Sequence, residues 1–236
     1  HSFPTRRSSD LSGAMCYRQL LEELESLADE NYRNFHKRLL KNENVNVLGV
    51  KIPVLRKIAK RYKNCVDELL TYPDEYYEVT FIKLTAVSDL GYESFINHVD
   101  GCVTLIDNWA TCDCFTPRCI KNHKENFLPF IEKYSLGDGE FTQRFALTTL
   151  LHFYVEERYF DFIIKTVLAC DTSKYYVHMA AAWLIAEMLV KNYSFTENFL
   201  KRNLLDKKTH NKAIQKACES FRLSDEQKKY LKEIKR

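Results

Sequence analysis

The sequence predicts an all-α fold, an α-solenoid of degenerate HEAT-like antiparallel helix pairs. Apolar side chains recur three and four positions apart through nearly the whole of the 236 residues, which is the period of an amphipathic helix. The chain has only 6 Gly and 5 Pro, too few for the many turns of an all-β sandwich. Hydrophobic residues make up 45% of the chain, enough for a substantial core and too many for a disordered protein.

The first half of the chain opens with an amphipathic helix, in which Leu20, Leu24 and Leu27 share one face. A second helix carries Phe35 and its apolar neighbours at 39 and 40. The segment 49–53 reads as a turn whose proline opens the next helix. The pattern therefore predicts helices over 17–27, around 35–40, over 54–62, and from Pro73-Asp74 to a C-terminus near Gly91.

The second half continues in the same way, with breakers such as Gly137-Asp138-Gly139 between the helices. No strand pattern and no strict repeat of fixed period is present, so the pairs would be degenerate units of roughly 35–45 residues. The concave face of such a solenoid is its usual binding surface. The expected helices are 92–105, 109–119, 123–134, 140–155, 157–169, 174–191, 195–204, 208–220 and 224–235.

The first fourteen residues differ from the rest because they lack both a helical period and the apolar centre of a signal peptide. We interpret 1–14 as a non-native leader, Met15 as the natural start, and 15–236 as one domain. No apolar run is long enough to cross a membrane. Without an export signal we expect a cytoplasmic protein, in which the eight cysteines stay reduced.

Positive charge is concentrated in two segments. Residues 201–236 hold 12 Lys and Arg against 5 acidic residues, whereas the first 200 residues hold 23 against 27. The second cluster has no acid between 51 and 63. Such clusters suit a polyanion such as DNA, although charge alone favours the simpler interpretation of solvated helix faces. The basic residues of the second cluster are Lys51, Arg56, Lys57, Lys60, Arg61 and Lys63.

Trp109 and Asp113 are four residues apart, so they share one face if their segment is a helix capped by Asp107 or Asn108. An indole ring beside a carboxylate forms a site for a cation, because both groups attract positive charge. The second tryptophan, Trp183, follows three alanines that would let a neighbour approach closely. Taken alone, the pattern is weak, and two core tryptophans with a surface acid explain it as well.

A zinc site is the rival interpretation of the same region. Cys112, Cys114, Cys119 and His123 have ligand-like spacing, but they lack the paired C-x-x-C knuckles of a zinc module. We therefore expect no metal here. No P-loop, dinucleotide-binding or hydrolase motif occurs. The single histidines at 152 and 178 lie on apolar helices, where a core role is commoner than a catalytic one.

Five segments, in order, resemble the AlkD-like DNA alkylation repair proteins, a family of HEAT-like-repeat DNA glycosylases. They are GVKIPVLR at 49–56, NWATCD at 108–113, Arg144 with its helix, Ala182-Trp183, and NKAIQK at 211–216. The resemblance extends from Met15 to the C-terminus. It implies excision of cationic N3- or N7-alkylated purines from double-stranded DNA, with no cofactor and no metal.

The resemblance also implies the roles of particular residues. Trp109, Trp183 and Asp113 match the family's two tryptophans and one catalytic aspartate, which line a cleft of the concave face. We expect a monomer that holds DNA phosphates through the basic clusters. The candidate phosphate contacts are Arg144, Lys57, Lys212 and Lys216, of which the last two are four residues apart on one helix face.

Two positions depart from the family pattern. Ala110 stands where many members have a second acid, and Ala186 stands where many have an arginine after the second tryptophan. Three function classes therefore stay open. They are an alkylpurine DNA glycosylase, a non-catalytic protein that binds DNA structures, and a solenoid for protein interactions. Salt-sensitive binding to duplex DNA separates the first two from the third, and base release separates the first from the second.

Overall fold

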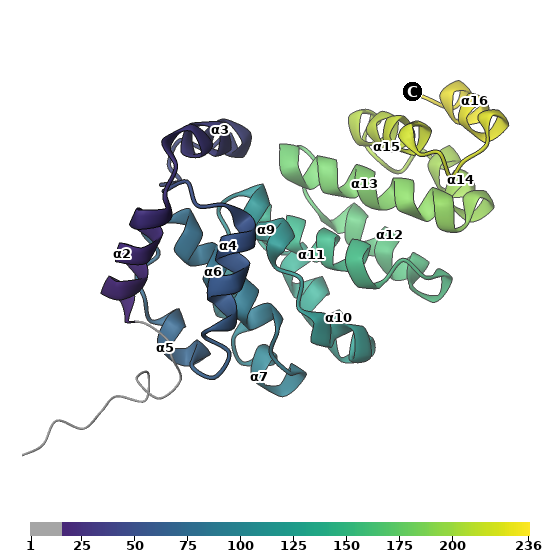
Figure 1. Cartoon of the computed structure of the whole chain (residues 1–236). Coiled ribbons are helices and arrows are strands. Elements are labelled where there is room, and N and C mark those ends of the chain that lie inside the picture. The colour runs from purple at the N-terminus through teal and green to yellow at the C-terminus, as the bar shows by residue number, and fades with distance from the viewer. Residues whose placement is uncertain (1–15) are drawn as a thin grey trace, which may run out of the picture. The chain divides into compact units, whose positions relative to one another are not determined.

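The computed structural model describes residues 16–236, and these residues are helical with no strand. They form fifteen α-helices and two short 3-10 helices, which confirms the predicted all-α fold (Figure 1). Contacts divide the chain into two compact units, the first ending at Cys119 and the second spanning Ile120–Arg236. The leader predicted over 1–14 lies outside the described residues, and the single domain over 15–236 stays a prediction.

The first unit is built around helix α6, on which α4, α5 and α9 pack. All residues of α6 except Thr85 are buried, so this helix is enclosed on every side. Its partner α4 has Pro53 in its first turn, as the sequence predicts. The helices are α2 (Tyr17–Leu27), α3 (Glu30–Leu40), α4 (Ile52–Lys60), α5 (Val66–Leu70), α6 (Tyr77–Ser88), α7 (Tyr92–Ile96), α8 (Val99–Thr104) and α9 (Trp109–Cys114).

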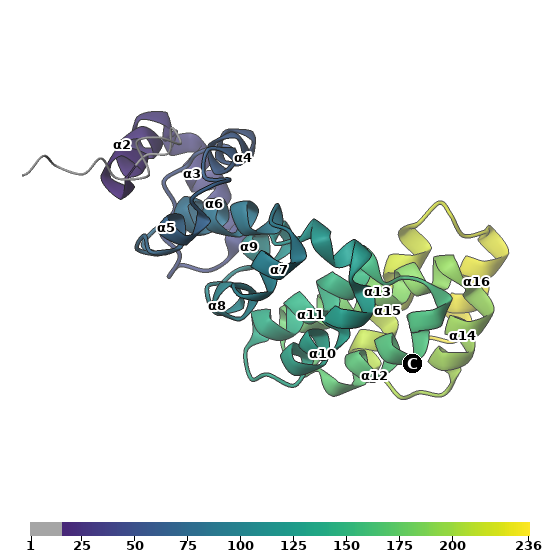
Figure 2. The same cartoon turned by 90° about the horizontal axis from the view of Figure 1, so that it is seen from below.

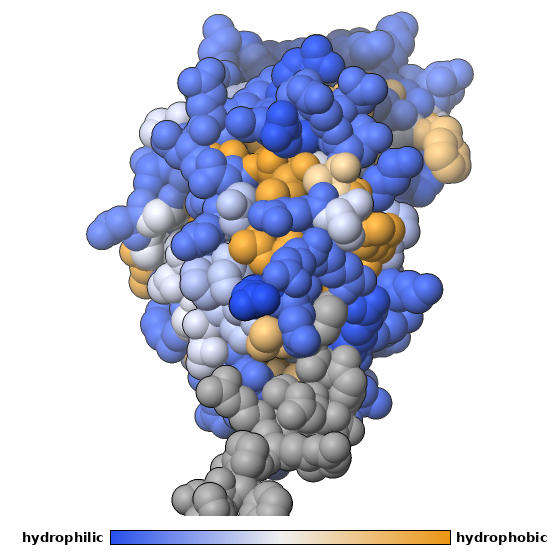
Figure 3. Space-filling model, turned by 60° about the vertical axis from the view of Figure 1, so that its left-hand side comes forward, coloured by the Kyte–Doolittle hydropathy of each residue, from blue (hydrophilic) through white to orange (hydrophobic). Residues whose placement is uncertain are grey.

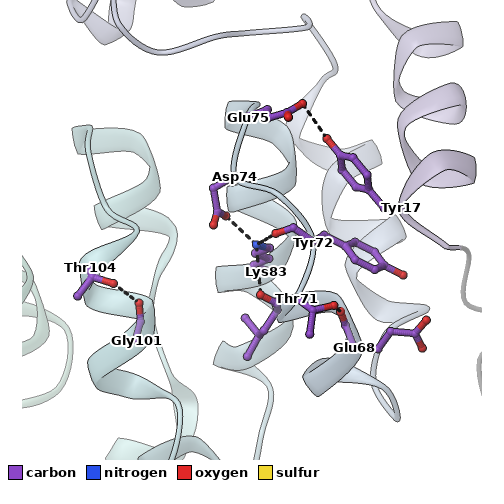
Figure 4. A network of polar contacts seen from close by, with 10 residues as sticks. Tyr17, Glu68, Thr71, Tyr72, Asp74, Glu75, Lys83, Gly101 and Thr104 are labelled. Atoms are coloured by element: carbon purple, nitrogen blue, oxygen red, sulfur yellow. Dashed lines mark hydrogen bonds and ion pairs between the residues drawn. The ribbon is translucent and has the colours of Figure 1, made fainter.

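Helix α6 carries two fully buried ionisable side chains, Glu78 and Lys83. The Lys83 ammonium donates to the Asp74 carboxylate at 2.7 Å and to the Tyr72 carbonyl at 2.5 Å (Figure 4). A buried charge is tolerated only when it is paired and hydrogen-bonded in this way. The Lys83 contacts therefore tie α6 to the segment that precedes it.

Glu78 fixes the turn before α4. Its Oε1 accepts hydrogen bonds from the backbone N–H groups of Leu48 at 3.0 Å and Gly49 at 2.9 Å. Gly49 has φ +96°, a left-handed conformation that favours glycine, and its carbonyl accepts from the Asp29 N–H at 3.0 Å. The start of the GVKIP segment is thus held between α3 and α6 by one backbone hydrogen bond to Asp29 and by the Glu78 carboxylate.

Replacing Glu78 by Gln is expected to change how stability depends on pH. Burial raises the pKa of Glu78 above its usual value of 4.5, so the folded chain holds the proton more tightly than the unfolded chain. The stability that Glu78 contributes is therefore fully present below pH 4.5 and is lost as the pH rises through the folded pKa. Urea unfolding of the wild type and of Glu78→Gln from pH 4 to 7 measures this pH dependence. The free energy of unfolding of the wild type should fall relative to Glu78→Gln, and a constant difference would contradict this assignment.

The second unit is a stack of two helix layers. Helices α11, α13 and α15 pack side by side in one layer, and α10, α12, α14 and α16 pack against them in the other (Figures 1 and 2). Ala180, Ala181 and Ala182 are buried in α13, where small side chains allow its two neighbours to come close. The helices are α10 (Lys124–Ser135), α11 (Glu140–Phe153), α12 (Phe160–Ala169), α13 (Tyr175–Lys191), α14 (Tyr193–Lys201), α15 (Lys207–Glu219) and α16 (Asp225–Glu233).

Several predicted boundaries are wrong. The expected helix 92–105 is two short helices, α7 and α8, and Gly91 is the N-cap of α7, with φ −67°, instead of a left-handed C-terminal residue of α6. The expected helix 109–119 stops at Cys114, because Pro117 disfavours helical backbone in the residue before it. The long helix begins at Tyr77, later than Pro73-Asp74, and α5 was not predicted at all.

The surface is largely hydrophilic in the view of Figure 3, with hydrophobic side chains gathered near the middle of that face. Within residues 16–236, no helix combines the length and the apolar character needed to cross a membrane.

Candidate nucleic-acid interface

Helix α9 brings Trp109 and Asp113 onto one short helical segment, as the sequence predicts. Asn108 is its N-cap, because the Asn108 side chain accepts a hydrogen bond from the Thr111 N–H at 2.9 Å. Both Trp109 and Asp113 are partly exposed, whereas the residues between them are buried. The buried face anchors α9 on α6 and leaves the indole and the carboxylate on its accessible side.

The indole of Trp109 is oriented by helix α3. Its Nε1–H donates to the Leu39 carbonyl at 3.0 Å, one of the carbonyls at the end of α3 that have no partner within the helix. A second bond joins the same segments, from the Asn42 side-chain amide to the Asp107 carbonyl at 3.0 Å. The polar edge of the indole is therefore occupied, and its ring faces remain the part that can contact a ligand.

A small cavity of about 280 Å³ lies beside the end of α9. It is lined by three basic residues from two directions, Arg56 and Lys60 on α4 and Arg118 after α9, together with the Cys114 thiol. Burial raises the pKa of Cys114, so this sulfur stays protonated and adds no negative charge. A phosphate oxygen fits such a cavity well, because three cations converge on it and Asp89 is its one acidic wall residue.

A second cavity of about 460 Å³ shares Lys60, Asp89 and Arg118 with the first and adds Lys63. Arg118 forms an ion pair with Asp89 at 3.4 Å across these cavities. The sequence predicted Lys57 as the phosphate contact of this segment. Lys57 is exposed in the last turn of α4, but it lines neither cavity, because Arg56 and Lys60 share the helix face that does, with Lys63 in the turn after the helix.

In the second unit, the predicted site residues all lie on one layer of helices. Arg144 is on α11, Trp183 on α13, and Lys212 and Lys216 on α15. These three helices pack side by side, so the predicted site residues of this unit all belong to the same layer. Burial lowers the pKa of His178 on α13, and Lys208, Lys212 and Lys216 lower it further. The positive field of α15 is thus felt at α13.

Arg144 is almost completely buried, with 7% of its surface exposed. Its Nη1 donates to the Tyr176 carbonyl at 2.9 Å, and its guanidinium lies 5.8 Å from the centre of the Tyr176 ring. The structure thus gives Arg144 a role inside the unit, where it joins α11 to the first turn of α13. A direct phosphate contact by Arg144 stays a prediction, and little of its side chain is available for one.

Trp183 is 38% exposed and lines a cavity of about 510 Å³ with Lys216 of α15. Ala186, one of the two departures from the family pattern, is also in the wall of this cavity. Phe221 and Arg222, from the loop after α15, also line it. Their positions in the sequence gave no signal, because neither lies on a helix whose periodicity could assign it to a face.

Some of the cysteines and histidines are core residues. Cys112 is buried, and the Cys114 thiol donates to the Thr111 carbonyl at 3.2 Å. Burial raises the pKa of Cys102 and of Cys170 to about 12. Residues 16–236 contain no group of three or more His, Cys, Asp or Glu side chains placed to hold a metal ion.

Of the two histidines expected in the core, one is buried. The Nδ1 of His178 lies 2.9 Å from the Thr209 hydroxyl, with the side chain enclosed between α13 and α15. His152 is exposed near the end of α11, so the core interpretation is wrong for this residue.

Comparison with known proteins gives one finding. A family model described as DNA alkylation repair enzyme matches residues 20–221, whereas a search among curated proteins gave no match. The matched range includes both units and the positions of Trp109, Asp113 and Trp183. The chain therefore belongs to the AlkD-like DNA alkylation repair enzymes.

Proposed function

We propose that this protein is a monofunctional DNA glycosylase that excises cationic N3- and N7-alkylated purines from duplex DNA in base excision repair. The observation that carries the proposal is the pairing of Trp109 and Asp113 on α9, with the indole fixed by the Leu39 carbonyl. Family membership indicates a role in the repair of alkylated DNA. The Trp109–Asp113 pair offers the groups that the proposed chemistry needs.

The proposed reaction uses the charge that the lesion already carries. An alkylated purine is a cation, so its glycosidic bond breaks with the electron pair going to the base, which leaves neutral. The sugar is left as an oxocarbenium-like cation. The Asp113 carboxylate stabilises this charge and orients the water that adds to the sugar and loses a proton. The ring face of Trp109 contacts the cationic sugar or base beside this carboxylate, and the part of Trp183 in the reaction stays a prediction. No cofactor or metal takes part, and the protein acts as a monomer.

DNA is proposed to bind through the two sets of basic residues. In the first unit these are Arg56, Lys60, Lys63 and Arg118, with Lys57 on the neighbouring face of α4. In the second unit Lys212 and Lys216 supply phosphate contacts from α15, while Arg144 fixes the start of α13.

The test of the proposal is base release. Duplex DNA that contains 7-methylguanine or 3-methyladenine is incubated with the protein, and the free base is measured. Neutral lesions should be poor substrates, because the site has no evident acid to protonate a neutral leaving base. Release of methylated base supports the proposal. Duplex binding without release would favour the second candidate, a non-catalytic protein that binds DNA structures. The observation that supports this candidate is Ala186 in the wall of the Trp183 cavity, at a position where many members of the family have an arginine.

Replacing Lys212 or Lys216 by Gln is expected to weaken duplex binding to a similar degree for every sequence. Each lysine that leaves a phosphate should make the plot of log affinity against log salt concentration less steep by about one unit. Fluorescence anisotropy at several salt concentrations measures this slope. Lys165→Gln is the matched control, because it removes the same charge from α12 in the other layer. An unchanged slope in both lysine variants would remove α15 from the interface.

A further inference from the structure

The loop between α15 and α16 presents a phenylalanine to solvent. Phe221 is 93% exposed, the highest value among the exposed large hydrophobic side chains of the described residues. Two residues later Leu223 is buried, at 6% exposure, so the loop does contribute to the core. A phenylalanine in water forgoes the stabilisation that its burial would give, and its ring is accessible to a ligand.

The loop is held in a defined conformation by polar contacts. The Ser220 hydroxyl accepts hydrogen bonds from the backbone N–H and from Nε of Arg222, each at 3.2 Å. The same guanidinium reaches α13, where its Nη2 lies 2.6 Å from Glu187 Oε1. Ser224 then caps α16 through the Gln227 N–H at 3.1 Å. Phe221 therefore points outward because the loop is fixed on both sides of it.

The ring stands at the edge of the Trp183 cavity. The walls of this cavity combine two aromatic side chains, Trp183 and Phe221, with two basic ones, Lys216 and Arg222. Two acids, Glu187 and Glu219, also line it, and the first of them is paired with the guanidinium. The segment 201–236 around it has 12 basic and 5 acidic residues, a net charge of +7.

Aromatic rings among basic side chains are how proteins hold unpaired bases. The ring stacks on the face of the base, and the cations contact the adjoining phosphates. A fully paired duplex offers no free base face to a ring, whereas a base without a partner does. The net charge of +7 on residues 201–236 also favours a polyanion over an apolar protein segment.

We propose that Phe221 stacks on an unpaired base of bound DNA at the Trp183 cavity, with Lys216 and Arg222 beside the phosphates of that nucleotide. The inference rests on the proposed function in one respect, that the ligand is DNA. It adds a contact that recognises a base without a partner, such as the base left opposite an excised purine.

The experiment compares two DNA probes in anisotropy titrations. One is a fully paired duplex, and the other is the same duplex with 2-aminopurine opposite a tetrahydrofuran abasic analogue. Phe221→Ala should bind the second probe about thirtyfold more weakly, the middle of the range for loss of one stacked base. Affinity for the paired duplex should stay within about twofold, and the salt dependence should not change because no charge is removed. The fluorescence of 2-aminopurine, quenched by the wild type, should recover in the variant.

Leu136→Ala is the matched control, since Leu136 is the other strongly exposed apolar residue of this unit, at 66%. It should bind both probes as the wild type does. Unchanged affinity of Phe221→Ala for the unpaired probe would overturn the inference and leave a protein partner as the occupant of this loop. Equal losses for both probes would also overturn it, because stacking requires a free base.

The two proposals can fail separately. A wild type that releases no methylated base, yet loses affinity for the unpaired probe on Phe221→Ala, would refute the glycosylase and retain the stacking contact. A wild type that releases base, together with a Phe221→Ala variant that binds both probes normally, would refute the stacking contact and retain the glycosylase.

Discussion

Asp113→Asn is expected to slow the release of 7-methylguanine by a factor of about 100 or more. Asparagine keeps the shape of the side chain and removes its charge, so the developing positive charge on the sugar loses roughly 3 kcal/mol of stabilisation in the transition state. Affinity for DNA should fall little or even rise, because a negative charge near the phosphates is removed. Single-turnover excision, with enzyme in excess over a methylated duplex, measures the chemical step without product release.

The control for this variant is Asp161→Asn, which removes the same charge from an exposed position on α12. It should excise at the wild-type rate. An unchanged rate for Asp113→Asn would show that the carboxylate takes no part in the reaction, and would leave Trp109 with its structural role at the α3–α9 contact.

Gly49→Ala should destabilise the first unit by about 3 kcal/mol or more, the upper part of the range for a strained backbone position. The φ of +96° is unfavourable for alanine, and a Cβ there would lie 2.5 Å from the Asp29 carbonyl oxygen and 2.7 Å from the Cβ of Arg33. Relief of this clash would move the loop away from Glu78 and cost the hydrogen bonds that its carboxylate accepts. Urea unfolding followed by circular dichroism measures the loss.

Gly91→Ala provides the comparison within the same unit. Gly91 has φ −67°, and a Cβ there meets no atom within 4 Å, so alanine should change the free energy of unfolding by less than about 1 kcal/mol. Similar stabilities of the Gly49 and Gly91 variants would mean that the loop before α4 relaxes freely, and that Glu78 does not fix it.

The sequence predicts most of the helices because their apolar positions repeat at the helical period, and the bounds of α2 agree in full. Periodicity fails where a local stereochemical rule intervenes. Pro117 ends α9 early, and the extended φ of Gly91 opens α7 where a left-handed C-terminal residue was expected. The second of these cannot be deduced from residue type, since glycine suits both conformations.

In the candidate site, too, some features follow from the local sequence and others depend on tertiary contacts. The Trp109–Asp113 pair follows from spacing on one helix, whereas the burial of Arg144 depends on Tyr176, thirty-two residues away. The choice of Arg56 over Lys57 as a cavity residue depends on how α4 rotates against α6. Tertiary contacts decide both, and a single sequence does not contain them in any local pattern.

The burial of the thiols affects how the protein reacts with alkylating agents. Agents that methylate DNA also attack sulfur, and they react with the thiolate far faster than with the thiol. Because burial raises the pKa of Cys102 and Cys170 to about 12, almost no thiolate forms there at neutral pH, and both side chains are buried as well. Cys16, at the start of α2, is exposed and therefore accessible to such agents. Alkylating agents are thus expected to modify an exposed thiol such as Cys16 before the buried ones, which would leave the core of a DNA alkylation repair protein intact.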